Sequence, residues 1–144
     1  MKNSIIALFF ITNIVFAKET ILDKNLEQYQ SETTFSTLLC SIKYKNELYA
    51  IQAGNVVEEK DSLHGCVTEK KATANALIKK ILSNKKNLKI NNILKEFHIA
   101  YLARLDGINT DVSETAIDYN RRQKSLEDKA NELWSRYELE KQLN

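Results

Sequence analysis

The chain of 144 residues has no proline and only three glycines. An all-β fold needs many turns, and turns draw heavily on these two residues. Their scarcity therefore argues against such a fold and favours long helices. Hydrophobic residues make up 43% of the chain and charged residues 28%, which argues against intrinsic disorder and allows a single domain with a buried core.

Sequence motifs of catalysis are missing as well. There is no G-x-S-x-G, no glycine-rich phosphate loop and no H-E-x-x-H. The two histidines, His64 and His98, lie too far from each other and from the cysteines to show the ligand spacing of a zinc site. We therefore expect a protein that is not an enzyme and that uses no metal and no cofactor.

Residues 1–17 have the pattern of a secretory signal peptide. Lys2 gives a short positive start, residues 5–16 are apolar with two exceptions, and Ala17 stands where a signal peptidase cuts. The apolar run is shorter than the roughly 20 residues of a membrane-spanning helix, so an uncleaved anchor is the less favoured alternative. We expect cleavage after Ala17, a mature single domain of residues 18–144 without a transmembrane segment, and a periplasmic or secreted protein.

The charge of the mature chain is close to balanced. Cleavage removes one basic residue and no acidic one, which leaves 20 basic and 19 acidic residues, or a formal net charge of +1. This balance predicts no strong steering of partners by the whole molecule. Export, and the lack of aromatic residues interleaved with the basic ones, argue against nucleic acid as a partner.

Cys40 and Cys66 are expected to form one disulfide, because paired cysteines of exported chains are usually oxidised. Two free buried thiols are the alternative. The bond would close a loop of about 27 residues and contribute on the order of 3 kcal/mol to stability. Bridged Cα atoms lie within about 7 Å, so the chain must fold back between the two positions.

The first part of the mature chain predicts two helices. Residues 20–29 carry apolar side chains at near-helical spacing and indicate a short first helix. Capping residues at 31–34 then precede a second helix from about 34 to 53, which ends at Gly54. Its apolar residues follow an i, i+3, i+4 pattern and are expected to face the core: Phe35, Leu38, Leu39, Ile42, Leu48, Tyr49 and Ile51.

The segment that follows has no clear periodicity. Asp61–Ser62 offers an N-cap, and His64–Gly65 is expected to form a turn. From Val67 an amphipathic pattern predicts a third helix, with lysines on its polar side. A polar connection at 83–87 ends it.

Two further helices complete the expected fold. Apolar side chains recur at steps of three and four from Ile90 to Leu105, and Gly107 is expected to end that helix in a left-handed conformation. Asp111–Glu114 fits a capping box, and a long last helix is expected to reach about Leu139. The predicted fold is all-α: a small bundle of four to five helices with a long C-terminal helix and one disulfide.

The strongest surface feature of the sequence is a basic segment, residues 70–95, which contains eight lysines and no acidic residue. We interpret it as a docking surface for an anionic partner, with a solvated lysine-rich face as the alternative. The candidate partner-binding residues are Lys70, Lys71, Lys79, Lys80, Lys85, Lys86 and Lys89.

The other candidates for chemistry favour structural roles. His98 lies beside an apolar stripe and is expected to be a partly buried residue with a satisfied hydrogen bond, and His64 to lie at the surface. The acidic residues at 58–61 are expected to form a solvated loop. The aromatic residues of the last helix lie on its apolar stripe and are expected to pack in the core, with an exposed anchor for a partner as the alternative: Tyr119, Trp134 and Tyr137.

These observations favour a small exported protein that acts by binding another protein, such as an inhibitor or an immunity-type protein. The partner would be an acidic protein if the basic segment carries the contact. The alternative is a periplasmic structural or chaperone-like protein that works as a homodimer, paired through the long last helix.

Overall fold

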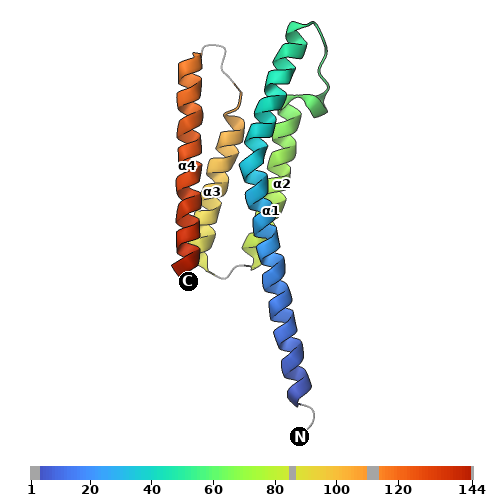
Figure 1. Cartoon of the computed structure of the whole chain (residues 1–144), viewed down its shortest axis with the longest axis vertical. Helices are drawn as coiled ribbons and strands as arrows, with labels where there is room; N and C mark the ends of the chain where they lie inside the picture. The colour runs from blue at the N-terminus through green and yellow to red at the C-terminus, as the bar shows by residue number, and fades with distance from the viewer. Residues whose placement is uncertain (1–3, 85–86, 110–113, 144) are drawn as a thin grey trace.

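The computed structural model describes the backbone of residues 4–84, 87–109 and 114–143, and within these ranges the side chains from Lys24 onward except that of Asn84. This part of the chain is a small all-α bundle with one disulfide, which confirms the predicted fold class. Four α-helices and a short 3-10 helix form it (Figure 1): α1 (Ser4–Gln52), η1 (Glu59–Asp61), α2 (Leu63–Asn84), α3 (Leu88–Asp106) and α4 (Ala116–Leu143).

The four helices form two hairpins that lie next to each other. α1 packs along α2, and α3 packs along α4 (Figure 1). The hairpins meet where α3 contacts α1 and α2. The core therefore has α3 near its centre, with α4 on one side of it and the first hairpin on the other.

The N-terminal part of α1 projects beyond the ends of the other helices (Figure 1). Leu26 is the first buried side chain described along this helix. The expected cleavage after Ala17 falls nine residues before this side chain. Among the residues described with their side chains, no helix is long and apolar enough to cross a membrane.

The prediction of two helices before Gly54 was wrong, because α1 is one continuous helix across the expected break at 31–34. The hydroxyls expected to cap a new helix instead donate to carbonyl oxygens one turn earlier on α1. Thr33 donates to the Gln30 carbonyl at 3.1 Å, and Thr34 donates to the same carbonyl at 2.8 Å. Such internal bonds let hydroxyl side chains sit within a helix without ending it. Gly54, with a φ of +76°, follows the end of α1 as predicted.

The face of α1 that packs on the rest of the molecule is also not the predicted one. It carries Tyr29 and Cys40, both fully buried, and between them small hydroxyl residues, among them Ser36 at 1% exposure. The apolar residues that were expected to face the core are instead between 41% and 69% exposed: Phe35, Leu38, Leu39, Ile42, Leu48, Tyr49 and Ile51.

The start of α2 is set by two hydrogen bonds. Ser62 is the N-cap, since its hydroxyl accepts the Gly65 amide at 3.0 Å. The Leu63 amide donates to the Glu47 carboxylate on α1 at 2.6 Å. The expected turn at His64–Gly65 is therefore helical and lies in the first turn of α2, which begins before Val67. Gly65 is required there, because a Cβ would lie 1.9 Å from the carbonyl oxygen of Glu59.

The predicted disulfide is present and joins α1 to the first turn of α2. The Cα atoms of Cys40 and Cys66 are 5.6 Å apart, and both side chains are buried. The chain between them runs out along α1 and returns through the segment that contains η1, as the prediction of a fold-back required.

The second hairpin follows its sequence pattern more closely. Asn87 caps α3 by accepting the Lys89 amide at 3.0 Å. Gly107 follows α3 as expected, but its φ of −72° is right-handed, so the predicted left-handed cap was wrong. A Cβ at Gly107 would lie 2.7 Å from the end of the Leu126 side chain on α4, so a larger residue here would require that side chain to move. The predicted capping box at 111–114 lies mostly outside the described residues, and Thr115 accepts the Asp118 amide at 3.2 Å before α4.

Candidate functional site

The basic segment is distributed over α2 and α3, and part of its charge is neutralised by other helices. The ammonium nitrogen of Lys70 lies 3.3 Å from the carboxylate of Glu32 on α1. Lys71 pairs with the carboxylate of Asp106 at the end of α3.

Lys89 on α3 forms a similar contact with Glu140 on α4 at 2.8 Å. Lys79 and Lys80 are exposed on α2, and Lys85–Lys86 lie outside the described residues. Lys70, Lys71 and Lys89 therefore join helices to one another. The docking role of the basic segment stays a prediction.

His98 lies in a polar layer where α1, α2 and α3 meet. Its Nε2 is 2.8 Å from the side-chain oxygen of Asn75 on α2, and its Nδ1 is 2.8 Å from the hydroxyl of Tyr29 on α1. A carbonyl oxygen only accepts, so Nε2 carries the proton and Nδ1 accepts the Tyr29 hydroxyl. His98 is 9% exposed and has a hydrogen bond at both nitrogens, as the sequence predicted.

Burial shifts the titration of this layer. It lowers the pKa of His98, because the charged imidazolium is poorly solvated there. Burial also raises the pKa of Tyr29. Burial raises the pKa of Tyr101 to about 12, against the opposite effect of the hydrogen bond with Ser36, whose hydroxyl lies 2.7 Å away. The layer is therefore uncharged at neutral pH and joins three helices by hydrogen bonds.

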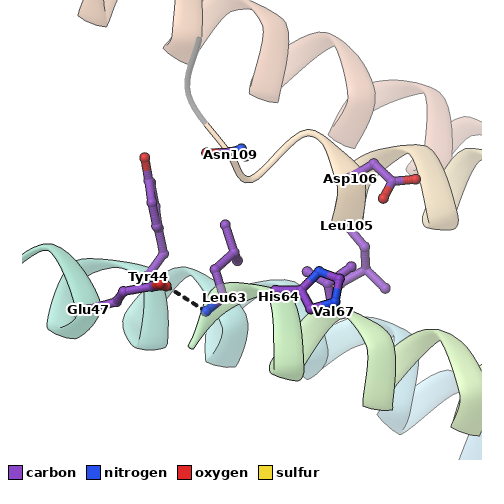
Figure 2. Close-up of a pocket in the computed structure, with 8 residues that line it drawn as sticks. All are labelled: Tyr44, Glu47, Leu63, His64, Val67, Leu105, Asp106 and Asn109. Carbon is purple, nitrogen blue, oxygen red and sulfur yellow. Dashed lines mark hydrogen bonds between the residues drawn. The ribbon is translucent and has the colours of Figure 1, made fainter. Parts of the chain in front are cut away.

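A hollow of about 320 Å³ lies between the first hairpin and the end of α3 (Figure 2). Its carboxylates are already engaged: Glu47 accepts the Leu63 amide, and Asp106 pairs with Lys71. The side chain of His64 is 80% exposed, and its imidazole lies 4.0 Å from the carboxylate of Glu59, a residue that does not line the hollow. The residues that line it are Tyr44, Glu47, Leu63, His64, Val67, Leu105, Asp106 and Asn109.

Neither the histidines nor the acidic residues gather into a metal site in the described part of the chain. No group of three or more His, Cys, Asp or Glu side chains there could hold an ion. The residues at 58–61 form an exposed turn around η1, where Lys60 pairs with Glu58 at 2.8 Å. This matches the expectation of a solvated acidic loop.

Two of the three aromatic residues predicted to pack in the core from α4, Trp134 and Tyr137, do so. Tyr137 is fully buried, and the centroids of the Trp134 and Phe97 rings are 5.0 Å apart. Tyr119 is half-buried, and its hydroxyl donates to the Ile108 carbonyl at 3.1 Å. Trp134 also lines a hollow of about 210 Å³ between α1, α3 and α4. These side chains thus stabilise the second hairpin rather than form an exposed anchor.

The surface that sequence reasoning missed is on α1. We define the outer face of α1 as Phe35, Leu38, Leu39, Ile42 and Tyr49. At 100° per residue these positions lie on one side of the helix, opposite to the buried Tyr29, Ser36 and Cys40. Each member of the outer face is between 47% and 69% exposed.

The outer face was visible in the sequence as an amphipathic stripe, but the sequence did not show whether this stripe faces the core or the solvent. The i, i+3, i+4 spacing was taken as the sign of a core-facing stripe. Cys40 carried the contrary signal, because a buried disulfide at that position turns the opposite side of the helix towards α2.

Comparison with known proteins adds no family to this description: no family model, no curated protein and no solved structure matches the chain. Any functional conclusion therefore depends on the chemistry and exposure of the residues described above.

Proposed function

We propose that this chain is an exported, non-enzymatic protein of the inhibitor or immunity type, which acts by binding another protein through the outer face of α1. The observation that carries the proposal is the exposure of five large apolar side chains on one side of a helix. Isolated exposed apolar residues are common on soluble proteins, but contiguous apolar patches mark interaction sites.

The spacing within the outer face also suggests how a partner would be bound. Phe35, Leu38, Leu39 and Ile42 stand at i, i+3, i+4 and i+7. This is the set of anchors that an amphipathic helix lays into an apolar groove. The partner best matched to this face is therefore a globular protein with an apolar groove about two helical turns long.

The export part of the proposal has two supports. The first is the signal-peptide pattern of residues 1–17, which α1 continues from Ser4 in its projecting N-terminal part. The second is the buried disulfide between Cys40 and Cys66. Disulfides of this structural kind persist in oxidising compartments and are rare in the cytosol.

The test is a capture experiment with the oxidised mature chain, residues 18–144, immobilised and exposed to a periplasmic extract of the cells that produce it. We expect one stoichiometric protein, identified by mass spectrometry. The double variant Leu38→Glu, Ile42→Glu should reduce its retention by roughly tenfold or more, because charges would replace two central anchors.

Two matched variants separate the outer face from other surfaces. Ile99→Glu changes an apolar side chain on α3 that is 67% exposed and should retain the partner. Lys79→Glu, Lys80→Glu changes the exposed part of the basic segment and should also retain it. Loss of the partner with the lysine variant alone would move the binding site to the basic segment. Equal retention by all variants would refute a role for the outer face.

A further inference from the structure

The outer face of α1 has a symmetric order of side chains. Its central apolar residues, Phe35, Leu38, Leu39 and Ile42, are separated by three, one and three positions. Read in the opposite chain direction, the spacing is the same. The exposed polar residues Ser31 and Asn46 lie four positions outside this group at either end.

Such symmetry matters because a two-fold interface uses the same patch on both copies. When two α1 helices lie antiparallel with their outer faces together, Leu38 of one copy meets Leu39 of the other. Phe35 of each copy then meets Ile42 of the other. Every apolar side chain of the group has an apolar neighbour, and the polar ends fall outside the contact.

The size of the face suits such a contact. At about 200 Å² of accessible surface per large apolar side chain, the exposed fractions of the four central residues correspond to roughly 420 Å². A standard interface buries about 800 Å² on each partner, of which the rim is polar. The four residues therefore supply the apolar centre of one side of such an interface, about half of its area, and a polar rim supplies the rest.

A lipid surface fits the face less well. Helices that lie on membranes carry rows of Lys or Arg beside their apolar side. Beside the outer face, Lys45 is exposed, while Lys43 is occupied by the Lys60 carbonyl and lies 3.7 Å from the Asp61 carboxylate. These few charges do not form a row along the helix.

We infer that, in the absence of another partner, a second copy of this chain covers the outer face of α1 in an antiparallel two-fold dimer centred between Leu38 and Leu39. This inference uses the surface on which the proposed function rests and adds what occupies it in the free protein. A partner protein then has to displace the second copy, so dimerisation and partner binding compete. The contact lies on α1 and not on the long last helix.

The geometry gives a sharp cross-linking test on the full mature chain. Under mild oxidation, Leu39→Cys should link to itself across the dimer, because the two sulfur-bearing positions are offset by only about 1.5 Å along the axis. Tyr49→Cys should not, because antiparallel pairing places the two copies of this residue roughly 30 Å apart. Non-reducing gels with mass spectrometry of the linked peptide would read both results.

Sedimentation of the protein without added cysteines provides an independent measurement. At micromolar to submillimolar concentration the mature chain should sediment as a dimer, and Leu38→Glu, Ile42→Glu should raise the dissociation constant by roughly tenfold or more. Circular dichroism and the intact disulfide would show that the variant is folded. Ile99→Glu should remain dimeric.

A monomeric mature chain would overturn the inference, and so would a dimer that the double variant Leu38→Glu, Ile42→Glu leaves unaffected. Cross-linking by Tyr49→Cys as strong as by Leu39→Cys would also overturn it, because it would indicate a parallel pair. A monomer that sediments with phosphatidylglycerol vesicles would overturn it in favour of lipid docking. A monomer whose partner capture depends on Leu38 and Ile42 would leave the proposed function intact. A dimer that captures no protein would refute the proposed function alone.

Discussion

The two hairpins of this protein are held together by different means. α1 and α2 are joined by the disulfide between Cys40 and Cys66, and α1 turns small hydroxyl residues such as Ser36 towards the core. α3 and α4 have no covalent link and pack aromatic rings against each other, with Phe97 on Trp134 at 5.0 Å. Ion pairs border the second contact, including Arg104 with Glu127 at 3.2 Å.

The difference shows how a cross-link changes what a helix must bury. A disulfide stabilises the fold mainly by restricting the unfolded chain, and this contribution does not require apolar contact in the native state. In the first hairpin it allows the apolar residues of α1 to remain outside. The second hairpin depends on apolar burial, so side chains such as Leu105 and Tyr137 face inward, and apolar residues such as Ile99 that stay exposed are scattered singly.

The largest effect that tests this contrast comes from truncating one leucine in each hairpin. Leu105 on α3 is fully buried, and Leu105→Ala should lower the free energy of unfolding by about 3 to 4 kcal/mol through lost burial and a cavity. Leu38→Ala on α1, where the side chain is 58% exposed, should change it by less than about 0.5 kcal/mol. Urea unfolding at a dilution at which the chain is monomeric would measure both. Equal losses would mean that the outer face is buried within one chain.

The next largest effect should come from removing the disulfide. Cys40→Ala, Cys66→Ala is expected to cost on the order of 3 kcal/mol, since it releases a loop of about 27 residues in the unfolded chain. Hydrogen exchange should accelerate most in α1 and α2. The amides of α3 and α4 serve as the internal control, and an equal acceleration in all four helices would show that the two hairpins do not differ in this way.

The smallest effect concerns the polar layer between the hairpins. Burial lowers the pKa of His98, so the unfolded chain binds a proton there more readily than the folded chain. Stability should therefore fall as the pH drops below the ordinary histidine value of about 6.5, and level off below the lowered pKa. Tyr29→Phe, which removes the hydrogen bond to Nδ1, should cost about 1 kcal/mol at neutral pH.

Unfolding free energies measured across this pH range would show the dependence. His98→Gln should remove the part of the pH dependence that arises near neutrality. His64→Gln, at an exposed position in the first turn of α2, is the matched control and should leave it unchanged. If the pH dependence disappeared with His64→Gln instead, it would arise from His64, and its assignment to His98 would be wrong.

The helices were predictable because local signals decided them. The lack of proline, the N-cap expected at Asp61–Ser62 and the glycine that ends α1 are features of short segments, and the structure agrees with each. The merging of two predicted helices into α1 was not predictable in this way. Serine and threonine can cap a helix or bond back within it, and only the packing of the neighbouring residues selects between the two.

The candidate site depended even more on tertiary structure. Periodicity located the apolar stripe of α1, but it cannot say whether a stripe meets this chain's own core or another molecule. The ion pairs of Lys70, Lys71 and Lys89 likewise join residues far apart in sequence, so a run of lysines in the sequence overstated the exposed positive charge.

By itself, the sequence determined the all-α class, the disulfide, the inward packing of Trp134 and Tyr137 and the satisfied state of His98. The class and the packing follow from local pattern, and the state of His98 follows from the cost of burying a polar group alone. The disulfide follows from the presence of two cysteines in a chain that carries an export signal. Only the tertiary structure decided which side of α1 faces the core. A helix with apolar residues on one side and small residues with a cysteine on the other can pack on either side. The choice was made by where Cys66 and the helices α2 and α3 meet Cys40 and Tyr29.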